Sequence, residues 1–195
     1  MAEVTTAQIK ELRDLTGVSV MQVKKVLEEA GGDMEKAKVL LQKKSSEIAA
    51  KKADRELGAG TVVAYTHNNN SVAAMVELQC ETDFVSGNED FKKVAYDIAM
   101  HIAAMNPAFK TEDDISQKDK DVAMSVFKDE VADKPADMQE KILEGKMNSY
   151  FKEKVLMSQS FIKDPSKTIQ DLVAEASQKF GERVELGRFS RISIN

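Results

Sequence analysis

The sequence predicts an α+β fold, in which a small three-helix module precedes a core of helices packed on a small antiparallel sheet. Apolar residues recur at helical spacing before residue 52, and they alternate at strand spacing between residues 61 and 78. Helical patterns then follow as far as residue 180. The chain has 195 residues, 42% of them hydrophobic and 31% charged, which is enough to bury a core of this kind.

The first 52 residues predict three short helices. The apolar residues at helical spacing are Ile9, Leu12, Leu15, Val20, Val23, Val26, Leu27, Met34, Ala37, Leu40 and Leu41. A Ser, Thr or Asp precedes each helix, and glycines follow the first two, as capping requires. The candidate caps are Thr5 or Thr6, Ser19 and Asp33, and the candidate ends are Gly17 and Gly31-Gly32.

A domain boundary is expected near residue 55. The stretch 51–56 is polar and charged, and Gly58-Ala59-Gly60 supplies a flexible break directly after it. We therefore expect one domain over residues 1–55 and a second over residues 56–195.

The second domain begins with a predicted β-hairpin. Residues 61–66 and 72–78 alternate as strands do, and His67-Asn68-Asn69-Asn70 forms an asparagine-rich turn between them. The sequence predicts four helices after the hairpin, at 88–106, 117–132, 135–150 and 165–180. The last of them starts at Asp164-Pro165, with an acidic cap and proline at the first helical position. The tail, residues 182–194, alternates imperfectly and is expected to return to the sheet.

Composition argues against several classes of function. A net charge of -5 and a pI near 5.3 disfavour a general nucleic-acid binder. Cys80 has no partner for an intramolecular disulfide, and with His67 and His101 it makes too few ligands for a usual metal site. Residues 1–6 do not resemble a signal peptide, and no stretch has the length of a membrane span. We expect a cytoplasmic protein without cofactor, metal, nucleic acid or membrane.

An enzyme has little support in this sequence. There is no Gly-rich phosphate loop and no recognisable Ser/His/Asp arrangement. Cys80 with a distant histidine could serve as a thiol catalyst, but a single cysteine among apolar strand residues is more often a small buried hydrophobe. His101 lies in an apolar helical run, which favours a packed or dimer-interface histidine with a satisfied hydrogen bond.

Two segments resemble the signatures of the elongation factor Ts family. Residues 12–27 read LRDLTGVSVMQVKKVL, and residues 77–86 read ELQCETDFVS, with the Thr-Asp-Phe-Val core of the second signature. Val20-Met21 stands where members often have Met-Met, and Gly87 where they often have a basic residue. Long members have a core of two similar halves, whereas this chain has one. It therefore looks like a short member of the family, for which the resemblance implies a homodimer.

The resemblance implies a guanine-nucleotide exchange factor that binds elongation factor Tu and promotes GDP release by protein-protein binding, without catalysis of its own. In the family an Asp-Phe pair inserts into the nucleotide domain of Tu and disturbs the magnesium site. The implied contact residues are Thr82, Asp83, Phe84 and Val85, together with Arg13, Val20, Met21 and Lys24 of the first module and His67 of the hairpin.

Each of these contact roles has an alternative in which the residue is purely structural. From the pattern alone Phe84 would fill its own core, since a lone aromatic is usually inside. Val20 would equally belong to the core of the small bundle, and Arg13 and Lys24 would be solvated charges. His67 would be a polar turn residue. The three-helix module also resembles ubiquitin-associated folds, so a pure ubiquitin or peptide binder is the rival function.

Overall fold

The computed structural model describes residues 4–131 and 135–194. The chain divides into two compact units, and each is described by itself. The first comprises the residues up to Val63 with Val76–Asp97 and Asp171–Gly187, and the second comprises Ala64–Met75, Ile98–Gln170 and Arg188 onward. The first unit thus extends past residue 55 and includes later segments. A separate domain over residues 1–55 stays a prediction.

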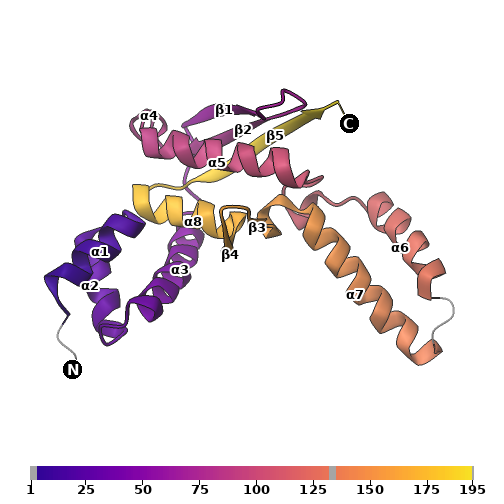
Figure 1. Ribbon diagram of the computed structural model, residues 1–195, viewed down its shortest axis with the longest axis horizontal. Coiled ribbons are helices and arrows are strands. Elements are labelled where there is room, and N and C mark those ends of the chain that lie inside the picture. Colours follow the sequence, from indigo (N-terminus) through magenta and orange to yellow (C-terminus); the bar gives the residue numbers. More distant parts are fainter. Residues whose placement is uncertain (1–3, 132–134, 195) are drawn as a thin grey trace. The chain divides into compact units, whose positions relative to one another are not determined.

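Three helices open the first unit: α1 (Thr6–Thr16), α2 (Val20–Glu29) and α3 (Met34–Lys51) (Figure 1). The side chains of Thr5, Ser19 and Asp33 cap them as predicted, and Gly17 ends α1 in the left-handed region. Their shared core consists of Leu12, Val18, Val23, Val26, Leu27, Ala30, Ala37 and Leu41. The predicted three-helix module is therefore confirmed, with a hydrophobic core of its own.

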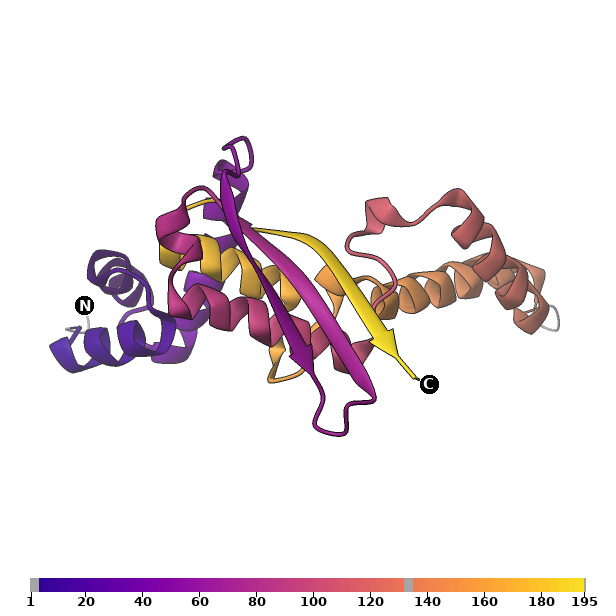
Figure 2. The ribbon, with the colours of Figure 1, turned by 90° about the horizontal axis from the view of Figure 1, so that it is seen from above.

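A three-stranded sheet follows, in the order β1-β2-β5. β1 spans Ala59–Thr66, β2 spans Val72–Cys80 and β5 spans Glu185–Ser193. Figure 2 shows the hairpin of β1 and β2 with β5 alongside β2. Asn70 in the turn has a φ of 56°, which asparagine tolerates. The predicted hairpin and the return of the tail to the sheet are both confirmed.

The later helices are α5 (Glu89–Met105), α6 (Gln117–Val131), α7 (Ala136–Lys154) and α8 (Ile169–Phe180). Within the first unit, the Phe91 ring of α5 meets the Phe180 ring of α8 edge-on, with centroids 5.5 Å apart. In the second unit, α6 and α7 lie side by side as a helical hairpin (Figure 1). The last residue of the helix expected over 117–132 lies outside the described residues.

Four short elements complete the described structure. α4 (Asp83–Ser86) follows β2, and the 3-10 helices η1 (Glu112–Asp114) and η2 (Leu156–Ser158) flank the α6–α7 hairpin in sequence. A two-stranded sheet pairs β3 (Ser160–Phe161) with β4 (Asp164–Thr168). In the part of the chain described, no helix combines the length and the apolar character needed to cross a membrane.

The predicted start of the last helix was wrong. Asp164 and Pro165 belong to β4, and α8 begins only at Ile169. The Asp164 carboxylate accepts hydrogen bonds from the backbone N–H and the hydroxyl of Ser166, at 3.2 and 2.5 Å. Asp before Pro suits a helix cap, but Asp also stabilises turns by bonding to the backbone two residues on. In this chain the local turn bond forms, and the helix starts later.

Candidate functional site

The segment 81–86, which we term the α4 turn, joins β2 to α5. Thr82 is the N-cap of α4, and its hydroxyl oxygen accepts a hydrogen bond from the N–H of Val85 at 3.4 Å. Val85 is buried, with 5% of its surface exposed, whereas Phe84 is 85% exposed. Asp83 is exposed as well. The turn is therefore anchored through one side chain and presents Phe84 and Asp83 to solvent.

Phe84 does not fill the core of its own chain, so the purely structural alternative for this residue is excluded. An aromatic ring that is exposed to water contributes no hydrophobic free energy until a partner covers it. An exposed Phe is therefore a candidate anchor for a partner pocket. Val85, which was also predicted to contact a partner, is buried and anchors the turn, and its contact with a partner, like that of Thr82, stays a prediction. Whether Asp83 and Phe84 contact a partner stays a prediction.

The predicted contact residues of the three-helix module surround the break between α1 and α2. Arg13 lies near the end of α1, and Val20, Met21 and Lys24 lie in the first turns of α2. All four are exposed, Met21 at 83% and Val20 at 49%. Val20 is therefore not part of the bundle core. Lys24 makes only a loose ion pair with Glu28, at 3.8 Å on the surface, which leaves its charge available to a partner.

His67 is exposed in the hairpin turn, and its Nδ1 lies 2.9 Å from the hydroxyl of Tyr65. It belongs to the second unit, whereas the other predicted contact residues, at the α4 turn and the α1–α2 break, belong to the first. The structure thus brings the α4 turn and the module surface into one unit and leaves His67 outside it.

The two residues considered for chemistry are both buried. Cys80 is fully buried, and burial, followed by the nearby charge of Glu182, raises the pKa of its thiol. A thiolate nucleophile needs the opposite environment, so Cys80 acts as a small hydrophobe. His101 is fully buried and hydrogen-bonded to Gln159 and to the backbone of Ile162. It is the packed histidine with satisfied hydrogen bonds that the sequence indicated.

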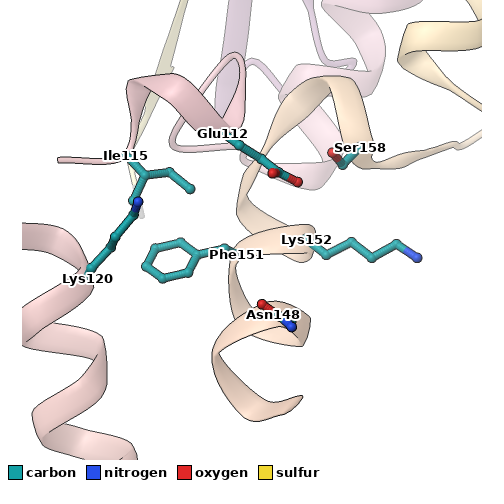
Figure 3. A pocket seen from close by; sticks show the side chains of 7 residues that line it. All are labelled: Glu112, Ile115, Lys120, Asn148, Phe151, Lys152 and Ser158. Carbon is teal, nitrogen blue, oxygen red and sulfur yellow. The ribbon is translucent and has the colours of Figure 1, made fainter. Parts of the chain in front are cut away.

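One of the described cavities lies at the root of the α6–α7 hairpin, in the second unit. This cavity has a volume of about 390 Å³ and is lined by Glu112, Ile115, Lys120, Asn148, Phe151, Lys152 and Ser158. Figure 3 shows that Lys120 and Lys152 extend to opposite sides of it, with the Phe151 ring between them. The two ammonium groups do not converge, so the cavity lacks the clustered charge that an anionic ligand requires.

Sequence reasoning missed the groups that hold the α4 turn in place. Glu182 accepts hydrogen bonds from Glu81 and Thr82, and Glu81 bonds Arg55 and Arg183. No local signal could have found this cluster, because Glu182 lies 100 residues from Thr82 along the chain. Only the pairing of the tail with β2 brings the two segments together.

Comparison with known proteins gives the same family for the family model and for the individual relatives. A family model described as Elongation factor TS matches residues 3–195. The chain belongs to the elongation factor Ts family. It is 47% identical over 193 residues to an elongation factor Ts of Leptospira biflexa, covering 98% of both chains. It is also 42% identical over 188 residues to that of Thermosipho melanesiensis (95% of this chain, 96% of the relative) and 39% identical over 192 residues to that of Thermotoga maritima (98% and 96%).

Membership of the elongation factor Ts family assigns the chain a role in translation elongation, and therefore in protein biosynthesis. These relatives match the chain over nearly their whole length, which agrees with the expected short form of elongation factor Ts.

Proposed function

We propose that the chain is a guanine-nucleotide exchange factor that binds elongation factor Tu in its GDP-bound or nucleotide-free form. In this proposal Phe84 inserts into the nucleotide domain of Tu, and Asp83 makes the polar contacts that position it. The observation that carries the proposal is the exposure of Phe84 on a turn anchored by its buried neighbour Val85. A large aromatic held in solvent is suited to a partner pocket, where a few such anchors supply most of the binding energy.

Exchange by this route needs no chemistry from the chain itself. GDP is held on Tu through phosphate and Mg²⁺ contacts that tolerate little displacement, so a side chain that shifts them weakens GDP binding. By linkage, GDP then weakens the binding of the chain to Tu by the same factor. GTP completes the cycle by binding the vacated site. The chain is accordingly proposed to act as a binding protein without cofactor or metal.

Arg13, Val20, Met21 and Lys24 form the proposed second contact with Tu. They combine exposed apolar surface with positive charge beside the α1–α2 break. A flexible, polarizable Met such as Met21 adapts readily to a partner surface. His67, on the hairpin of the other unit, is proposed as a peripheral contact in a dimer, where the hairpin of one subunit would serve the Tu bound by the other.

We also propose that the chain works as a homodimer in the cytoplasm, where translation takes place. Each strand of the three-stranded sheet has a large exposed apolar residue, namely Val62 in β1, Met75 in β2 and Ile192 in β5. A second copy would cover such residues and complete the two-half core that long members of the family contain in one chain.

Release of fluorescent GDP from purified Tu tests the exchange role. We expect wild type to accelerate release at catalytic amounts and Phe84→Ala to lose most of that acceleration, because truncating a central aromatic anchor costs about 2 kcal/mol or more. Asp83→Ala is expected to lose less. The matched control is Val39→Ala, which also removes an exposed apolar side chain of the first unit but lies in neither proposed contact. Absence of acceleration by wild type would refute the exchange role.

A further inference from the structure

The α4 turn is held by a carboxylate from the far end of the chain. Glu182 Oε2 accepts hydrogen bonds from the backbone N–H groups of Glu81 and Thr82, both at 3.0 Å. Its other oxygen, Oε1, accepts one from the Thr82 hydroxyl at 2.6 Å. Hydrogen bonds to a charged acceptor are shorter and stronger than neutral ones. Glu182 thus fixes both the backbone at the end of β2 and the side-chain rotamer of Thr82.

This arrangement determines how Thr82 caps α4. The hydroxyl has one proton, which it donates to Glu182, so the oxygen presents a lone pair to the N–H of Val85. α4 has only four residues and is too short to be stable by itself. Its start therefore depends on the cap, and the direction of Phe84 in the first turn of α4 depends on where that helix starts.

The hydrogen bonds between Glu182 and residues 81–82, which we term the clamp, are matched by bonds in the opposite direction. While Glu182 binds the backbone of Glu81, the side chain of Glu81 accepts a hydrogen bond from the backbone N–H of Arg183. The guanidinium of Arg55 reaches the same carboxylate at 3.1 Å, and its carbonyl accepts a hydrogen bond from Arg183 Nη1 at 2.5 Å. The N–H of Arg183, and then the charge of Arg55, lower the pKa of Glu81, so it stays ionised.

The segment that carries Glu182 is tied down on its other side too. Gly181 has a φ of 72°, which places the carbonyl of this residue where Lys52 Nζ donates to it. Lys179, the residue before Phe180 at the end of α8, forms an ion pair with Asp90 at 2.8 Å. All of these groups belong to the first unit. Glu182 therefore reaches the α4 turn from a fixed base.

We propose that Glu182 is a positioning residue for nucleotide exchange: it holds the α4 turn so that Asp83 and Phe84 are presented to the partner before binding. This role rests on the proposed function. A preorganised anchor binds without the cost of being ordered on contact. Glu182 does not itself touch Tu or GDP in this scheme; it acts through Thr82 and the backbone of the turn.

The first test concerns the free protein and needs no partner. Glu182→Gln keeps the shape of the side chain but leaves one oxygen for three donors and turns an NH₂ group toward some of them. We expect hydrogen exchange of the Thr82 and Val85 amides to become about tenfold faster, the factor that corresponds to about 1.4 kcal/mol. The control is Glu35→Gln, which removes a carboxylate paired with Lys38 at 2.7 Å in the same unit. Unchanged exchange at both amides would overturn the clamp.

The second test measures GDP release from Tu. We expect Glu182→Gln to slow the accelerated release about tenfold, by the same conversion, and Glu35→Gln to leave it unchanged. Thr82→Val removes the hydroxyl that donates to Glu182 and is expected to behave like Glu182→Gln. Both Glu182→Gln and Thr82→Val must keep the unfolding temperature within a few degrees of wild type, or the clamp stabilises the whole unit instead.

A double-mutant cycle separates positioning from a general structural effect. If Glu182 acts by presenting Asp83 and Phe84, then Glu182→Gln adds a much smaller loss in a Phe84→Ala background than in wild type. Additive losses would overturn the positioning role even if both single variants are slow. A wild-type protein that fails to accelerate GDP release would refute the proposed function instead, and the positioning role with it, whereas an active wild type with an equally active Glu182→Gln refutes the positioning role alone.

Discussion

Adjacent side chains in the α4 turn meet opposite environments, since Phe84 is exposed and Val85 is buried. In a helix of four residues, neighbours project in different directions, so one anchors the turn and the other is displayed. His101, which belongs to the second unit, is the opposite case, a polar ring that is fully buried. Its Nδ1 accepts from the N–H of Ile162 at 3.3 Å, so Nε2 carries the proton and donates to Gln159 at 2.9 Å.

His101 gives the protein a stability that depends on pH. Burial lowers the pKa of His101 below its ordinary value of about 6.5. Below that value the unfolded chain binds more protons than the folded one, so stability falls as pH drops from about 6.5 toward the lowered pKa. We expect the unfolding free energy of wild type, relative to His101→Gln, to decline between pH 7 and 5 in urea titrations. A difference that stays constant over this range would contradict the neutral buried ring.

At the scale of elements, helix ends and turns decide where side chains are displayed. Gly17 ends α1 with a φ of 69°, and a Cβ at this position would lie 2.8 Å from Lys179 Cε of α8. Gly17 thus serves two needs, a left-handed backbone and the close approach of the Lys179 side chain. The second need could not be read from the sequence, because residues 17 and 179 come together only in the folded unit.

Gly17→Ala and Gly31→Ala form a matched pair that separates these needs. Gly31 has a similar φ of 66° but open space where a Cβ would lie. Both changes pay about 1–2 kcal/mol for an L-residue in the left-handed region. Gly17→Ala must also displace Lys179, which weakens its 2.8 Å ion pair with Asp90. Urea unfolding is therefore expected to give a larger loss for Gly17→Ala, and equal losses would indicate that Lys179 moves aside freely.

At the scale of the whole molecule, the feature that matters is the set of large apolar side chains that a partner could cover. Val62, Met75 and Ile192 are exposed on the strands of one sheet, and Phe84 and Met21 are exposed on helices of the first unit. Monomeric proteins tolerate scattered apolar residues, so these residues by themselves do not establish an interface, and the dimer rests on the proposal above. Two kinds of partner follow from the proposals, a second copy for the sheet and Tu for the helices.

The dimer proposal predicts a mass near twice the 21.6 kDa of one chain in light scattering. Ile192→Glu places a charge on the exposed surface of β5, where a dimer would bury it unpaired, so we expect this variant to shift toward the monomer. The control is Val122→Glu on α6, which places the same charge at an exposed apolar residue outside the sheet. A wild-type mass of one chain at all concentrations would contradict the dimer.

The sequence by itself determined the helices, the hairpin, the return of the tail and the family, because periodicity, caps and signature motifs are local. Residues such as Ser19, Asp33 and Gly17 act within a few positions of where they stand. It misplaced the start of α8, since Asp164-Pro165 suits a helix cap and a turn equally well. Local signals that favour two structures are resolved only by the surrounding fold.

Only the tertiary structure decided which side chains are displayed and what holds them. Pattern alone favoured a buried Phe84, and it left Val20 at even odds, but the packing of Val85 and of the bundle core leaves both exposed. The contacts of Glu182 with the α4 turn arise from segments about 100 residues apart, which meet because β5 pairs with β2. Burial and long-range hydrogen bonds depend on the whole fold, and no spacing within the sequence records them.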